Sequence, residues 1–224
     1  MKASEIIFQA RGLMQDTKPP YLWTETELIQ YLNNSHNEAT EKAKLFLDSV
    51  TPAICRIAIL AGNPDPDYPL DNRIVEIVSA KLSTQARFLD RKTKTDLDGS
   101  NPDWRNAAPG DPRCFLTDYT EGRLTIHPKS NADATLFLTV YRLPLTQFTA
   151  DALDAEPEIH FRHHYRLVDG ILAQAYHKDD SETLDPEKAA RHEKAWLKHI
   201  DEMSRARLRI HRTQEFLGPN YGAI

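Results

Sequence analysis

The sequence predicts an α+β protein: an antiparallel helical bundle with an inserted small antiparallel β-module and a C-terminal docking arm. Three observations predict this architecture. Apolar residues recur at helical spacing in residues 1–50 and again in residues 145–204. Residues 51–144 contain short, alternating runs rich in β-branched residues. From residue 205 to residue 224, arginines are mixed with large apolar side chains. We therefore expect four parts with these boundaries.

Two helices are predicted in residues 1–50. Ser4 can cap a first helix that ends near Asp16. Thr24 and Glu27 have the capping-box spacing that starts a second helix, expected to run from about Glu25 to Asp48. Its apolar stripe is formed by Leu28, Leu32, Ala39, Ala43, Phe46, Leu47 and Val50.

Residues 51–144 predict a series of strands. The run 54–60 indicates a strand that is buried on both faces, and Cys55 within it is expected to be an inert apolar thiol. The further strands are expected over Arg73–Leu82, Arg113–Thr117, Arg123–His127 and Ala134–Tyr141. The polar stretch 91–110 predicts a loop that Trp104 anchors.

Two more helices follow, joined by a hinge over residues 179–186. One helix is expected to begin near Pro157. Its core stripe would be formed by Phe161, Tyr165, Val168, Leu172 and Tyr176. The next helix starts at Asp185-Pro186-Glu187, where an aspartate cap precedes a first-turn proline. Its buried face would contain Ala189, Trp196, Ile200 and Met203.

Composition excludes several classes of protein. The chain has 224 residues, of which 40% are hydrophobic and 27% charged, so we expect a folded globular chain. A net charge of −5 argues against a surface that binds nucleic acid throughout. Cys55 and Cys114 form no C-x-x-C pair, which predicts a reducing environment without disulfides or a zinc module. We expect neither a secretion signal nor a membrane span.

The histidines suggest metal chemistry, but the pattern does not complete a site. His160 and His164 could share a helical face beside His163, yet no glutamate stands between them as in H-E-x-x-H. His192 and His199 also fall on a common face. No nucleophile elbow, phosphate loop or dinucleotide motif occurs in the sequence. We expect no catalytic, cofactor or metal site. The alternative is a metal-dependent enzyme centred on His160 and His164.

The C-terminal arm is the main candidate for function. Its candidate residues are Arg205, Arg207, Arg209, Arg212, Phe216, Leu217, Tyr221 and Ile224. Guanidinium groups can pair with carboxylates of a partner protein while the apolar side chains fill pockets. The same arginines could instead contact nucleic-acid phosphates. The adjoining apolar tail favours protein docking, and a solvated terminus is the remaining alternative.

Short segments along nearly the whole chain resemble head-to-tail adaptor (connector) proteins of tailed bacteriophages. The opening of the chain carries Leu13-Met14-Gln15-Asp16, Pro20-Tyr21-Leu22-Trp23-Thr24-Glu25 and Tyr31-Leu32-Asn33. The middle carries Thr51-Pro52-Ala53-Ile54-Cys55, Tyr68-Pro69-Leu70-Asp71, Pro102-Asp103-Trp104-Arg105 and Tyr141-Arg142-Leu143-Pro144. The last part carries Ala175-Tyr176 and Asp185-Pro186-Glu187-Lys188-Ala189-Ala190. The histidine cluster departs from the family's pattern.

This resemblance implies a structural virion protein of the neck or connector region, present in the host cytoplasm during assembly. Its expected partners are the phage portal protein, a tail nozzle or tail-tube protein, and further copies of itself in a ring that is usually twelve-fold. Double-stranded DNA would pass through the lumen without specific binding. The family's C-terminal segment reaches onto the portal, which agrees with the docking arm. No enzyme activity, cofactor or membrane is implied.

Overall fold

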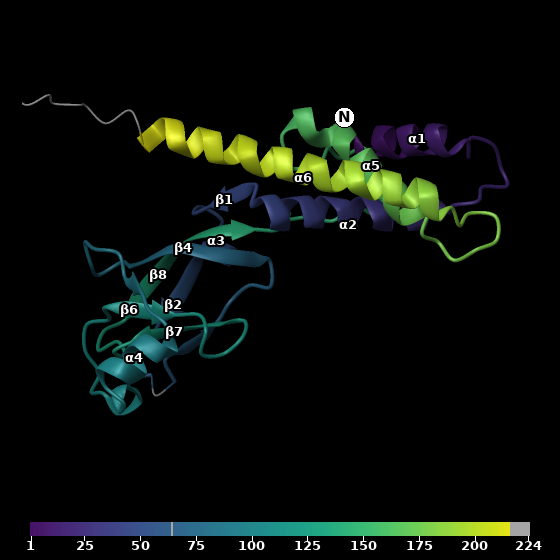
Figure 1. Cartoon of the computed structure of the whole chain (residues 1–224). Coiled ribbons are helices and arrows are strands. Elements are labelled where there is room, and N and C mark those ends of the chain that lie inside the picture. The colour runs from purple at the N-terminus through teal and green to yellow at the C-terminus, as the bar shows by residue number, and fades with distance from the viewer. Residues whose placement is uncertain (64, 216–224) are drawn as a thin grey trace, which may run out of the picture. The chain divides into compact units, whose positions relative to one another are not determined.

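The computed structural model describes residues 1–63 and 65–215, with side chains described as far as Arg209 (Figure 1). The chain divides into two compact units. The helical unit contains Met1–Phe46 and the chain from Pro144 onward, and the β unit contains Leu47–Leu143. The four-part division expected from the sequence stays a prediction.

In its described residues, the helical unit is built from four main helices and short 3₁₀ segments. The helices are α1 (Ala3–Met14), α2 (Glu25–Ala43), α5 (Leu167–Ala175) and α6 (Pro186–Glu215). The 3₁₀ segments are η2 (Ala150–Ala152) and η3 (Phe161–Arg166). α5 contacts α1, α2 and α6, and α6 also lies along α2 (Figure 1). Their apolar faces form one core, which includes Ile6, Leu28, Leu32, Ile171 and Trp196.

Where the structure describes it, the β unit contains two sheets of four strands. The strands are β1 (Phe46–Asp48), β2 (Arg56–Ile59), β3 (Asp67–Pro69), β4 (Ile74–Leu82), β5 (Asp90–Arg91), β6 (Cys114–Leu116), β7 (Arg123–His127) and β8 (Ala134–Arg142). In one sheet β8 pairs with β1, β2 and β4, and in the other the order is β3-β7-β6-β5. The pairing of β5 with β6 is parallel. Short helices α3 (Pro52–Cys55), α4 (Lys94–Ser100) and η1 (Trp104–Asn106) lie between the strands.

The predicted helical bundle with a small antiparallel β-module is therefore wrong. Within residues 1–63 and 65–215 the protein is a mixed α+β structure of six α-helices and eight strands in two sheets. The longer strands lie near their predicted positions. β1, β3 and β5 contain only two or three residues each, which is too short for an alternating pattern to be seen in the sequence.

Both capping predictions at the long helices are confirmed. In α2 the Glu27 backbone N–H donates to Thr24 Oγ1 at 3.3 Å, and the Thr24 N–H donates to Glu27 Oε2 at 2.7 Å. At the start of α6 the Lys188 N–H donates to Asp185 Oδ1 at 3.0 Å. α2 nevertheless ends at Ala43 rather than Asp48, because Lys44 adopts a left-handed conformation with φ 51°.

Three other local predictions are corrected. Residues 52–55 form a helical turn instead of the start of a strand, although Cys55 is buried as expected. Residues 94–100 of the expected loop form α4, whose start Thr93 and Asp96 cap. The helix expected from Pro157 begins as the 3₁₀ segment η3, which has three residues per turn. This leaves Phe161 72% exposed and outside the core.

Gly170 lies where three helices approach closely. A Cβ atom on this α5 residue would lie 2.5 Å from Ser35 Oγ of α2 and 3.1 Å from Trp196 Cε2 of α6. Real Cβ atoms essentially never lie within 3.0 Å of another atom, as this one would to Ser35, and the contact with Trp196 would also be unusually tight. The absence of a side chain at Gly170 therefore sets the spacing of these helices.

Candidate functional site

The first residues of the predicted docking arm lie on α6. The face that α6 buries, formed by Ala189, Trp196, Ile200 and Met203, is the one predicted from the sequence. The helix then continues to Glu215. Beyond Met203 it presents Arg205, Leu208 and Arg209 to solvent, and Leu208 is 46% exposed. A regular helix thus extends past its own core with arginine and leucine on its surface.

The remaining candidate residues are placed only in part. Arg207 is half-buried on α6. Arg212 lies in α6, but its side chain lies outside the described part of the structure. Phe216, Leu217, Tyr221 and Ile224 fall outside the described residues. The structure therefore brings Arg205, Arg207 and Arg209 together on one helix and leaves the assignment of the eight docking residues as a proposal.

Arg205 already has a partner within its own helix. Its Nε donates to Asp201 Oδ1 at 3.1 Å, and Nη2 lies 2.8 Å from Asp201 Oδ2. Both side chains are more than half exposed, so this pair contributes little to stability. The guanidinium group of Arg205 is therefore held on the helix surface by a pair within the same helix.

The histidines of the expected metal alternative make contacts within the protein. His164 is buried, with Nε2 2.8 Å from the Ile159 carbonyl oxygen and Nδ1 2.9 Å from the Met1 nitrogen. The His160 ring accepts a 3.4 Å bond from the Arg162 N–H. In the portion of the chain that is described, no three His, Cys, Asp or Glu residues are grouped so that they could hold a metal ion.

Asp169 explains the common face of the two later histidines. Its Oδ1 lies 2.8 Å from His192 Nδ1, and its Oδ2 lies 3.0 Å from His199 Nε2. A single carboxylate of α5 thus contacts two histidines that are about two turns apart on α6. The contact of Asp169 with these histidines could not be predicted from the sequence. Asp169 lies on α5 and the histidines on α6, and no local pattern links residues on two different helices.

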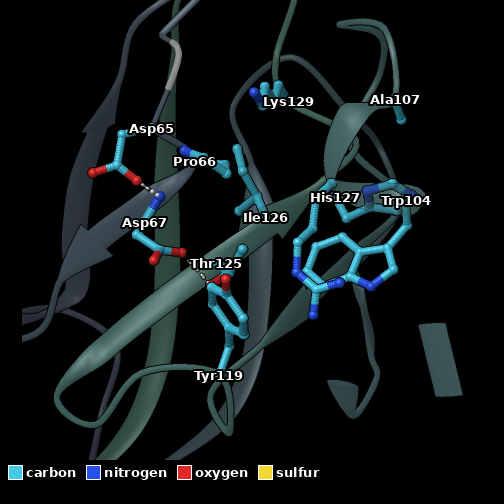
Figure 2. Close-up of a pocket in the computed structure, with 11 residues that line it drawn as sticks. Asp65, Pro66, Asp67, Trp104, Ala107, Tyr119, Thr125, Ile126, His127 and Lys129 are labelled. Atoms are coloured by element: carbon cyan, nitrogen blue, oxygen red, sulfur yellow. Dashed lines mark hydrogen bonds between the residues drawn. The ribbon is translucent and has the colours of Figure 1, made fainter. Parts of the chain in front are cut away.

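The β unit contains a hollow of about 240 Å³. Figure 2 shows Trp104 beside His127 on one side, and Asp67 close to Asp65 and Thr125 on the other. The Trp104 indole is buried as predicted for an anchor, and its Nε1 donates to Asp98 Oδ1 at 2.8 Å.

One guanidinium group lies against two aromatic rings in this hollow. The Arg105 guanidinium lies 4.6 Å from the Trp104 ring centre and 5.3 Å from that of Tyr119. Burial lowers the pKa of His127. The hollow is not predicted from the sequence, because its lining comes from β3, β7, η1 and the connections between the elements. Trp104 and Tyr119, two aromatic residues in polar surroundings, are the only sequence signal of it.

Comparison with known proteins relates the chain to one family. A family model described as SU10 adaptor protein matches residues 1–220. The chain belongs to this family. It is a family of phage head-to-tail adaptors, so the resemblance seen in the sequence is confirmed. A search of curated proteins found no match.

Membership of the adaptor family gives the site its context. An adaptor is a structural virion protein of the head-tail connection, located in the virion neck, and it interacts with other head or tail components. Such structural families are typically not enzymes. Of the helices in the described residues, none has the length and apolar character needed to cross a membrane.

Proposed function

We propose that this adaptor forms a homo-oligomeric ring, with the twelve-fold symmetry usual in its family, that joins the phage portal to the tail. The family match over residues 1–220 carries this proposal. In it, a tail nozzle or tail-tube protein binds below the ring, and double-stranded DNA passes through the lumen during genome ejection. The net charge of −5 is compatible with a channel wall that does not retain DNA.

The proposed contact with the portal is the C-terminal segment from Arg205 to Ile224. Support comes from α6, where Arg205, Leu208 and Arg209 face solvent beyond Met203, the last core residue of the described part of the chain. Arginine combined with exposed apolar side chains is typical of the energetically dominant residues of protein interfaces. A carboxylate-bearing surface of the portal would pair with these guanidinium groups.

Deletion of residues 214–224 is expected to abolish portal binding and leave the fold intact. The core of the helical unit ends at Met203, so the deletion removes none of its buried side chains in the described part of the chain. Binding to purified portal rings can be measured by co-sedimentation, and the fold by circular dichroism. A Lys194→Ala variant, altered at an exposed position of α6, serves as the control. Unchanged portal binding by the deletion variant would refute the docking assignment.

The alternative function is a nucleic-acid-binding packaging or virion factor that uses the arginine cluster. The observation in its favour is that Arg205 and Arg209 are both exposed on one helix. It requires DNA affinity that falls with rising salt and weakens when Arg205, Arg207, Arg209 and Arg212 are replaced by glutamine. The ring proposal predicts flat DNA-binding curves even at low salt, measured by fluorescence anisotropy.

A further inference from the structure

A hollow of about 130 Å³ lies beside the C-terminal half of α6 in the helical unit. Its apolar wall contains Phe46, Ile159 and Met203. Its basic side chains are His160, Arg162, His163 and Arg207. Among the described residues that line the hollow, none is acidic. The hollow therefore combines an apolar floor with a positively charged rim.

His163 lines this hollow, and one of its ring nitrogens has no hydrogen-bond partner within the described residues. The side chain is only 7% exposed, and the nitrogen is Nδ1. Burial, together with the nearby charges of Arg162 and Arg166, lowers the pKa of His163 to about 4, so the ring is neutral. A buried polar nitrogen without a partner is energetically unfavourable. A carboxylate that entered the hollow would face the guanidinium groups of Arg162 and Arg207 and would not be repelled by a neighbouring acid of the described lining.

A segment with matching chemistry lies at the other end of α6. The hinge between α5 and α6 presents three exposed acids, Asp179, Asp180 and Glu182. Beside them Leu184 is 46% exposed. The hinge thus presents the apolar side chain of Leu184 next to carboxylates, and the hollow presents an apolar surface next to basic side chains. The two surfaces are complementary.

The hinge of a chain cannot fill the hollow of the same chain. Asp185 and Met203 are separated along α6 by roughly 27 Å, at 1.5 Å per residue. Figure 1 shows the hinge at the start of α6, at the opposite end from its C-terminal half. Any contact between the two surfaces must therefore join different copies of the chain.

We propose that the acidic hinge of one copy docks into the basic hollow of the next copy, with Leu184 on the apolar floor. Carboxylates of the hinge then face Arg162 and Arg207. Because the two surfaces differ, the contact is head-to-tail, and repetition of such a contact closes a ring when the rotation between copies allows it. The inference rests on the proposed ring and identifies the contact that forms it.

Self-association of the full-length protein tests this contact. Sedimentation velocity over a range of concentrations should show that the wild-type chain associates and that added salt weakens the association. Arg162→Asp and Leu184→Ser should each weaken association by about tenfold or more, because one places like charges together and the other removes the apolar contact. Lys194→Asp makes the same charge change at an exposed position of α6 outside the hollow, and it should have little effect.

A charge swap gives the decisive variant. Asp179→Arg alone should weaken association, whereas Arg162→Asp combined with Asp179→Arg should restore it, since positions 162 and 179 then again carry opposite charges. A wild-type chain that stays monomeric at all concentrations, or single variants that associate like the wild type, would overturn the inference. Neither result depends on portal binding. The self-association experiment therefore tests this contact, and the portal-binding experiment tests the proposed docking function independently.

Discussion

Replacing Asp48 with asparagine is expected to destabilise the β unit by about 3–5 kcal/mol. Asp48 Oδ2 accepts a 2.6 Å bond from Arg142 Nε, and the two side chains are only 8% and 9% exposed. Oδ1 accepts the backbone N–H groups of Val50 and Thr51 at 2.8 and 3.1 Å. Asparagine keeps the shape of the side chain but removes the charge that faces the buried guanidinium group. Urea denaturation of the two proteins measures the difference.

A second ion pair in the same unit provides the control. Asp71 and Arg73 also form a close pair, with Nη2 2.8 Å from Oδ2, but their side chains are 23% and 36% exposed. Solvent screens this pair, so Asp71→Asn should cost about 1 kcal/mol or less. Equal losses from the two substitutions would contradict the view that burial makes the Asp48 pair important.

The Asp48 pair also predicts how stability depends on pH. Burial alone would raise the pKa of Asp48, but the hydrogen bonds from Thr51, Val50 and Arg142 outweigh it and hold that pKa well below its usual range. A lowered pKa in the folded state means that the stabilisation is present above about pH 4 and is lost as the pH falls below that value. The wild type should therefore lose more stability than Asp48→Asn on acidification.

Gly170→Ala is expected to destabilise the helical unit by about 1–3 kcal/mol, because the new methyl group overpacks a closed site. Its Cβ would lie 2.8 Å from Ser35 Cβ as well as 2.5 Å from Ser35 Oγ. In a helix without such a clash, alanine is more favourable than glycine by about 1 kcal/mol. A loss of stability in Gly170→Ala would therefore indicate the clash. Thermal unfolding followed by circular dichroism measures it.

Two further variants separate the clash from helix propensity. A Cβ atom on Gly12 of α1 would meet no other atom within 4 Å, so Gly12→Ala should leave stability unchanged or raise it. Ser35→Gly removes the atoms that the Gly170→Ala methyl group would meet. The double variant should therefore be more stable than the sum of the two single changes indicates. Strict additivity would show that α2 and α5 can move apart at little cost.

The parts of the fold that can be predicted from the sequence are those with a local signal. Thr24 and Asp185 start helices through hydrogen bonds to residues three positions later, so their role is visible in a short window. The strands Ile74–Leu82 and Ala134–Arg142 are long enough for their alternation to be visible. The end of α2 has no such signal, since it depends on the backbone conformation of a single lysine.

The candidate sites show the same division. Arg205, Arg207 and Arg209 follow one another closely and stand out in the sequence as a group. The hollow around His163 does not stand out, because its walls come from the chain after α2, from η3 with the two residues before it, and from α6. No spacing rule links these three segments, and only the packing of the helical unit brings them together. The acidic hinge is visible in the sequence as a connection between two helices. Its complementarity to the hollow can be seen only when the structure shows both surfaces.

The pairing of β1 with β8 has a consequence for how the β unit could be exchanged. The chain enters this unit on β1 and leaves it on β8, and these two strands are hydrogen-bonded neighbours. An inserted segment whose ends already lie together can be shortened, lengthened or replaced without a new path for the chain. Residues 47–143 therefore form a cassette: a related phage could acquire a different one in a single recombination event, and an engineer could excise it as a gene fragment.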